Sequence, residues 1–297
     1  MWIIYALASV FLQGVVNYID EHLTNNNKVG ENTDIHTRIG GLLLISTLMS
    51  FVGAFLIWFF TRDILLTKEA RYLAMASSIP MVAFYAAFFY LLLSYPVHLV
   101  GPLFQISTIW MLVIELLMGG SITSLGLLGI VVLIYGAYIL DAGTLRWKIP
   151  TKLLLISIPA TSTYAFALLL VRTASTGGTG MAITFWQMFS IGLTGIILFI
   201  FSRKYRNGFV IRIKEQGKSF LGFSFLNEMT AEGSFLFANL AVAIAPIGAY
   251  VSAMSGVQSV FVLLLFYFFP QGERSKITAM QWFSVILISI GVFLINI

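Results

Sequence analysis

The sequence predicts an all-α membrane protein, with ten transmembrane helices arranged as two inverted five-helix repeats. Three observations support this fold class: the composition, the ten apolar segments, and features that recur in both halves. The chain has 297 residues, of which 59% are hydrophobic and 10% are charged. A soluble domain carries roughly 25% charged residues. The composition therefore indicates a polytopic membrane protein, and no polar stretch is long enough to form a separate soluble domain.

Apolar segments of about 20 residues recur along the whole chain, and a helix of that length crosses the hydrocarbon core of a bilayer. Such a helix also satisfies its own backbone hydrogen bonds. Short connectors such as 94–96 and 119–121 make neighbouring helices antiparallel. The predicted spans are 2–20, 39–60, 71–93, 97–118, 122–141, 153–172, 180–202, 218–240, 244–269 and 277–297. The predicted longer polar links are 21–38, 61–70, 142–152 and 203–217.

The polar link in the middle of the chain divides the spans into two predicted repeats, 1–145 and 146–297. Some residues recur at one offset: Gln105 and Gln258 are as far apart as Gly119 and Gly272. An odd number of spans in each half makes the second half enter the membrane upside down. Inverted halves around a site at the bilayer midplane are common in secondary transporters.

Glycines near the end of each half carry a family resemblance. They are Gly119, Gly120, Gly129 and Gly136 in the first half, and Gly272 and Gly291 in the second. This pattern resembles the EamA-type repeat of the drug/metabolite transporter superfamily. The resemblance implies a ten-helix transporter with a central cavity lined by the first, third, fourth, sixth, eighth and ninth helices.

The basic residues bear on orientation and on partners. The loops on the side of the termini carry only Arg62, Lys68, Arg71 and Arg172, whereas most Lys and Arg lie on the opposite side. The positive-inside rule therefore predicts that both termini lie outside the cytoplasm, although the family resemblance implies the reverse. The 17 Lys and Arg against 12 Asp and Glu give a net charge of +5. This excess in loops favours the anionic headgroups of the lipid bilayer as a partner over nucleic acid.

Two acidic residues lie inside the eighth predicted span. A carboxylate at the bilayer centre costs about 3 kcal/mol on insertion scales, so it must face protein, water or a transported molecule. Glu228 and Glu232 are four positions apart and share one helix face. Two close carboxylates can share a proton, which predicts proton coupling to a cationic or amine-bearing substrate. The alternative is a structural pair that is hydrogen-bonded to neighbouring helices.

Amide side chains are the first candidates for contact with a substrate. Gln13 and Asn17 share one face of the first predicted helix, and Gln105 and Gln258 occupy matching places in the two halves. These four amides either orient the polar groups of a substrate or join helices through interhelical hydrogen bonds. The matching glutamines are further expected to form two walls of one cavity.

Two tyrosines and a third acid complete the candidate site. Tyr85 and Tyr164 lie close to Pro80 and Pro159, which allow helices to bend, and aromatic rings can hold a cation. We therefore assign both tyrosines to substrate binding. Glu115 lies nearer a membrane end than Glu228. It is a candidate for proton or cation coupling, and the alternative is an ion pair with a basic group at the interface.

These patterns predict a proton-coupled secondary transporter that works by alternating access. Its expected cargo is a small organic metabolite such as an amino acid or an organic cation, and its expected location is the inner (plasma) membrane. A flippase or exporter of a lipid-linked or amphiphilic molecule is an alternative. An integral membrane enzyme and a structural assembly partner are more remote alternatives.

No cofactor or metal site is expected, and we do not expect an enzyme. The chain has no Cys, which excludes thiolate metal sites and a Cys nucleophile. The Gly-rich segment 177–180 lacks the Gly-Lys-Ser/Thr of a phosphate-binding loop. Glycines 126, 129 and 136 permit close helix packing, either within the monomer or in a homodimer.

Overall fold

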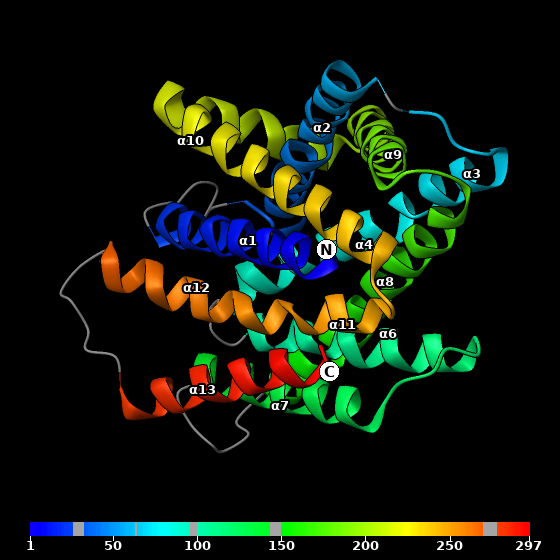
Figure 1. The fold of residues 1–297 in the computed structure, drawn as a ribbon. Helices are drawn as coiled ribbons and strands as arrows, with labels where there is room; N and C mark the ends of the chain where they lie inside the picture. The colour runs from blue at the N-terminus through cyan, green and yellow to red at the C-terminus, as the bar shows by residue number, and fades with distance from the viewer. Residues whose placement is uncertain (26–32, 63, 96–99, 143–149, 270–277) are drawn as a thin grey trace.

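The computed structural model describes residues 1–297 except 26–32, 63, 96–99, 143–149 and 270–277, and the described parts form a bundle of helices (Figure 1). The α-helices are α1 (Trp2–Asn25), α2 (Ile35–Thr61), α3 (Lys68–Ala76), α4 (Ser78–Ser94), α6 (Ile106–Leu117), α7 (Ser124–Ala142), α8 (Thr151–Ala174), α9 (Gly180–Phe201), α10 (Arg203–Ile244), α11 (Gly248–Ala253), α12 (Ser255–Phe268) and α13 (Ala279–Leu294). Two 3-10 helices are η1 (Gly101–Gln105) and η2 (Ser175–Gly177). The all-α prediction is confirmed.

Six helical segments of the described chain are long and apolar enough to cross a membrane. They are Trp2–Ile19, Ile35–Thr61, Lys68–Ser94, Thr151–Gly177, Gly180–Phe201 and Gly248–Phe268. Shorter apolar helices cover Leu103–Leu117, Ser124–Leu140 and Ala279–Leu294. The remaining predicted span, 218–240, lies inside α10. The chain therefore has the helices of a multi-pass membrane protein.

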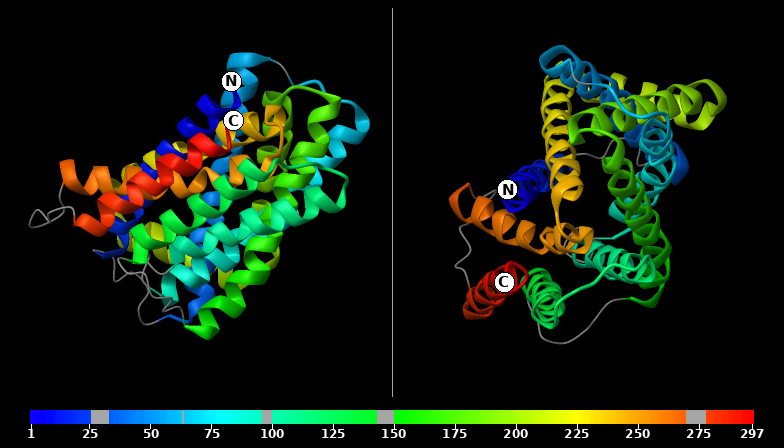
Figure 2. Two further views of the ribbon diagram at one scale, coloured as in Figure 1. Left: turned by 60° about the horizontal axis from the view of Figure 1, so that its bottom comes forward. Right: turned by 45° about the vertical axis from the view of Figure 1, so that its right-hand side comes forward.

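The predicted polar link at 203–217 is wrong, because these residues form the first part of α10. The hydroxyl of Ser202 begins this helix by accepting a hydrogen bond from the Tyr205 backbone N–H at 3.3 Å. A Cβ added to Gly208 would overlap the carbonyl oxygen of Thr37, and one added to Gly41 would lie 2.7 Å from the Gly208 carbonyl oxygen. Close packing on α2 thus stabilises a helix that the polar composition did not predict. Figure 2 (right) shows this yellow-green start of α10 lying across the direction of its yellow end.

Three of the predicted spans are each built from two consecutive helices. The third span contains α3 and α4, the fourth contains η1 and α6, and the ninth contains α11 and α12. The junction between η1 and α6 in the fourth span contacts the junction between α11 and α12 in the ninth span. Gln105 Nε2 donates to Ser255 Oγ at 3.0 Å, and the Thr108 and Ser252 hydroxyl oxygens are 3.0 Å apart. These hydrogen bonds join the two halves of the chain near the middle of the bundle.

The glycines of α7 pack against α13 inside the monomer. A Cβ added to Gly129 would lie 2.9 Å from the Gly291 carbonyl oxygen, and one added to Gly136 would lie 3.2 Å from the Ile288 backbone nitrogen. The two helix backbones therefore approach closely, as small residues allow. The N-terminus and the C-terminus lie at the same end of the bundle (Figure 1).

Candidate functional site

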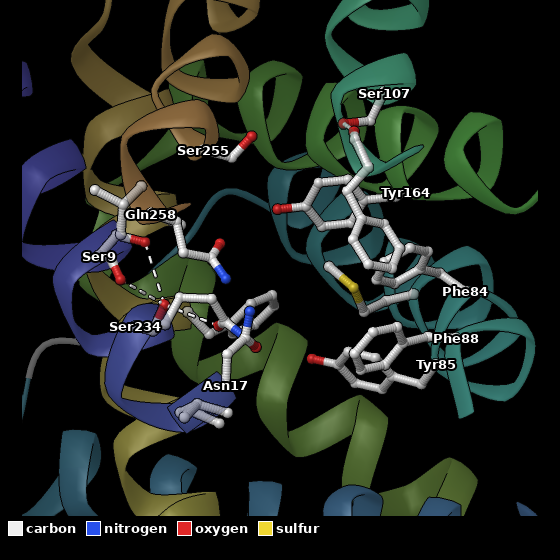
Figure 3. Close-up of a pocket in the computed structure, with 18 of the residues that line it drawn as sticks. Ser9, Asn17, Phe84, Tyr85, Phe88, Ser107, Tyr164, Ser234, Ser255 and Gln258 are labelled. Atoms are coloured by element: carbon white, nitrogen blue, oxygen red, sulfur yellow. Dashed lines mark hydrogen bonds between the residues drawn. The ribbon is translucent and has the colours of Figure 1, made fainter. Parts of the chain in front are cut away.

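A central cavity of about 240 Å³ lies between the helices (Figure 3). Its walls come from α1, α4, α6, α8, α10, α11 and α12, together with η1. These helices belong to the six spans that the family resemblance implies as cavity-lining. Leu42 and Ser46 of α2 also line the cavity, although the resemblance does not imply this helix.

One side of the cavity is polar and is formed mainly by α1 and α10. Gln13 and Asn17 both line it, one helical turn apart. The Ser234 hydroxyl lies 3.3 Å from Gln13 Oε1 and 3.3 Å from the Ser9 hydroxyl, and it can donate to the Ser9 carbonyl oxygen at 2.9 Å. Gln13 therefore joins α1 to α10 and also faces the cavity. Asn17 of α1 also lines the cavity and is labelled below Ser234 in Figure 3.

The opposite side of the cavity is aromatic and is formed mainly by α4 and α8. The Phe84 ring lies with its centroid 4.7 Å from that of Tyr164 and 5.4 Å from that of Phe104. Ring contacts at these distances hold the side chains in defined orientations. Tyr85 and Tyr164 both line the cavity, and their hydroxyl groups point toward the polar side in Figure 3.

The two carboxylates of α10 lie on the cavity wall beside α2. Ser46 Oγ donates to Glu228 Oε1 at 2.7 Å, and Ser50 Oγ donates to Glu232 Oε1 at 2.6 Å. The serines are four positions apart on α2, as the glutamates are on α10, so two parallel serine–glutamate hydrogen bonds connect the helices. Glu232 is only 9% exposed. Within the described ranges it has no ion pair, and a serine hydroxyl is its hydrogen-bond donor.

The acidic pair has both a structural contact and access to the cavity. The carboxylates are hydrogen-bonded to a neighbouring helix, and they also line the central cavity. A hydroxyl donor orients a carboxylate without neutralising its charge. Each glutamate can therefore attract a cation or bind a proton. Across the described segments, no cluster of three or more His, Asp or Glu side chains is placed to hold a metal ion.

The matching glutamines occupy different positions relative to the cavity. Gln258 lines it, whereas Gln105 is 4% exposed and lies behind the wall. Gln105 donates to Ser255, which is itself a lining residue. The oxygen of the Gln105 side chain is buried without a hydrogen-bond donor among the described residues.

Glu115 lies outside the cavity lining, in a cluster at the end of α6. Its carboxylate forms an ion pair with Arg172 of α8, with Oε1 at 2.9 Å from Nε. It also accepts hydrogen bonds from the first backbone N–H groups of α11, those of Gly248 at 2.8 Å and Ala249 at 2.9 Å. Arg172 in turn donates to the carbonyl oxygens of Val242, Ala245 and Pro246. This geometry corresponds to the ion-pair alternative for Glu115.

Sequence reasoning did not single out the hydroxyl groups that hold the site. Ser46 and Ser50 are separated by the same four positions as Glu228 and Glu232, which is a weak signal in hindsight. Serine is common in membrane helices and bonds its own backbone there, so spacing alone does not identify its partner. Phe84 and Phe88 were also missed, because 26 Phe residues are spread over the chain.

Comparison with known proteins identifies a fold and no family. No family model matches the sequence, and no curated protein matches it. In contrast, 23 chains of solved structures are similar in fold. One of them, described only as "Crystal structure of protein", has a TM-score of 0.69 at 9% identity. That match covers 99% of this chain and 96% of the other, so the two share an architecture over nearly their whole lengths.

Proposed function

We propose that the protein is a secondary transporter that exchanges protons for a small organic cation or amine. The observation that carries this proposal is the position of Glu228 and Glu232 on the wall of a central cavity that aromatic rings also line. Buried acids in membrane proteins mark substrate and ion pathways. An aromatic ring attracts a cation through its face. The site therefore suits a cargo with one positive charge and an apolar body.

The proposed coupling depends on competition between a proton and the cargo for the carboxylates of Glu228 and Glu232. When Glu232 is ionised, it attracts the positive charge of the cargo; when a proton binds, that attraction is lost and the cargo is released. The hydroxyl groups of Ser46 and Ser50 hold the two carboxylates against α2 through hydrogen bonds. The amides of Gln13, Asn17 and Gln258, with the hydroxyls of Tyr85 and Tyr164, would bond the polar groups of the cargo. An amino acid, which carries an amine, belongs to the same proposal.

Alternating access would move the two halves of the chain around this cavity. We propose that the halves are inverted repeats of the EamA type, in a protein of the drug/metabolite transporter superfamily. Helices that are broken near a site are typical of transporters built this way. The break between η1 and α6 and the break between α11 and α12 meet beside the cavity, which supports a hinge there. We place the protein in the inner membrane.

The test is transport by purified protein in liposomes with and without a pH gradient. A panel of organic cations, amines, amino acids and neutral sugars identifies the cargo. We expect Glu232→Gln and Glu228→Gln each to slow gradient-driven uptake by at least about tenfold, because an amide cannot exchange a proton. Glu69→Gln is the matched control, since Glu69 is an exposed residue of α3. Wild-type rates of gradient-driven uptake in both cavity variants would overturn the proposal.

Movement of an amphiphilic or lipid-linked molecule is a second candidate function. The phenylalanines of the aromatic wall favour it, because Phe84, Phe88 and Phe89 offer an apolar surface to a hydrophobic tail. The same liposomes distinguish the two candidates. A fluorescent lipid analogue would change leaflets in the presence of the protein if this function is correct, whereas a small-cation transporter would leave it in place.

A further inference from the structure

Two arginines lie near each other outside the central cavity, where the start of α2 packs on the start of α10. Arg38 belongs to α2 and Arg212 to α10. The Cδ atom of Arg212 lies 3.1 Å from the place that a Cβ would take on Gly41. Gly41 follows Arg38 by three positions and shares its helix face. The close approach of Gly208 to Thr37 packs the two helices together at this level, and Arg38 is near enough for its charge to act on Arg212.

The charges of this arginine pair are not balanced by acids in the described part of the chain. The ion pairs there join Arg172 to Glu115 and Lys204 to Asp34. The Nε atom of Arg38 is buried and makes no hydrogen bond to a described residue. Burial, followed by the positive charge of Arg38, lowers the pKa of Arg212 to about 10. A buried donor and two like charges are stabilised when an anion lies between them.

The surroundings of the arginine pair resemble a membrane interface. Val210 and Ile213 of α10 are 39% and 38% exposed, and Lys204 and Lys214 are exposed on the same helix. A helix that presents apolar and basic residues together lies at the boundary between headgroups and acyl chains. Basic clusters at that level attract anionic lipids. The cavity begins one helical turn further along α2, at Leu42.

We propose that Arg38 and Arg212 together bind a phosphate group, which comes either from an anionic lipid headgroup or from a free phosphate. Guanidinium groups donate paired hydrogen bonds to phosphate oxygens, and two of them facing one space can hold a single tetrahedral anion. Asp34, the nearest described acid along α2, already accepts hydrogen bonds from the backbone and hydroxyl of Thr37 and is paired with Lys204. The site is separate from the carboxylates of the proposed transport cavity.

The test is the thermal unfolding of purified, delipidated protein in detergent, titrated in two arms. One arm adds phosphatidylglycerol and the other adds inorganic phosphate. We expect phosphate-bearing ligand to raise the unfolding midpoint of the wild type. The half-saturating concentration should increase about tenfold in Arg38→Gln and in Arg212→Gln, because one charge-assisted pair is lost. Arg203→Gln is the matched control, since Arg203 is an exposed residue of the same helix.

Each arm identifies one source. Stabilisation by phosphatidylglycerol alone assigns the site to a lipid headgroup, and stabilisation by inorganic phosphate as well assigns it to free phosphate. Equal half-saturating concentrations in Arg38→Gln, Arg212→Gln and Arg203→Gln would overturn the proposal, and so would a wild type that neither ligand stabilises. If a glutamine variant does not fold, Arg38→Lys and Arg212→Lys keep the charge but lose the paired geometry. Wild-type affinity in both lysine variants would also overturn it.

Discussion

At the residue scale, acids in apolar helices have two different environments in this protein. Glu115 receives an arginine and two backbone N–H groups, and thus three donors surround one carboxylate. Glu232 receives a serine hydroxyl and faces the cavity. The ion pair and the backbone donors connect the Glu115 carboxylate to α8 and α11. The Glu232 carboxylate lines the cavity, so a ligand in the cavity can reach it.

This difference predicts opposite consequences for two conservative substitutions. Glu115→Gln should lower the free energy of unfolding by about 2–3 kcal/mol, because Arg172 loses its ionic partner while it remains partly buried. Folded Glu115→Gln protein should retain transport. Glu232→Gln should leave stability nearly unchanged and lose gradient-driven transport. Thermal unfolding in detergent measures the first effect, and liposome uptake per folded molecule measures the second. A stable Glu115→Gln protein that does not transport would contradict a purely structural role of the Glu115–Arg172 ion pair and would favour a role of Glu115 in coupling.

At the element scale, α10 has two functions along its length. Its first part packs on the start of α2 through Gly208. Its later part carries Glu228 and Glu232, which accept hydrogen bonds from two serines of α2. The two helices therefore position the proposed phosphate site and the cavity wall together.

A matched pair of glycine substitutions on α10 tests this packing. A Cβ on Gly208 overlaps backbone atoms of α2, whereas a Cβ on Gly222 would have nothing within 4 Å. Gly208→Ala should lower the free energy of unfolding by about 1–3 kcal/mol, as overpacked cores do. Gly222→Ala should raise it by roughly 0.5–1 kcal/mol, because alanine loses less backbone freedom in a helix. Equal midpoints of thermal unfolding in the two variants would show that the glycine contact does not hold the helices together.

At the scale of the whole molecule, the chain ends and the basic start of α10 lie at different ends of the bundle. Trp2 stacks on Tyr250 of α11, so the N-terminus lies near the Arg172–Glu115 ion pair, which also contacts α11. The helix α9 runs from this end of the bundle to the basic start of α10. A membrane protein with this distribution places its basic end in the cytoplasm. The proposed phosphate site would then face the cytoplasmic leaflet, where anionic lipids are enriched.

Reporter fusions at the two chain ends test this orientation. An alkaline phosphatase fused after Ile297 should be active, because the charge distribution puts that end outside the cytoplasm. A fusion before Met1 should report the same side, since both ends lie at one end of the bundle. A green fluorescent protein in place of phosphatase gives the complementary signal. Fluorescence from the C-terminal fusion, without phosphatase activity, would show that the family expectation is correct and the charge count is not.

The hydropathy of the sequence by itself determined that the chain is all-helical and where its apolar helices lie. Each predicted span coincides with a helix or with consecutive helices, because a run of apolar residues long enough for the bilayer must satisfy its backbone hydrogen bonds locally. The polar faces of single helices, such as Gln13 with Asn17 and Glu228 with Glu232, were also readable, since residues four apart share a face.

Tertiary structure alone decided which of those polar residues face a common space. The hydrogen bonds from Ser46 and Ser50 cross 182 positions, and the bonds from α11 to Glu115 cross 133 and 134. Local patterns carry no information about such partners. The helix at 203–217 was missed for the same reason, because its polar sequence is stabilised by the contact of Gly208 with a distant helix. Long-range packing, rather than local propensity, separates the cavity carboxylates from the structural one.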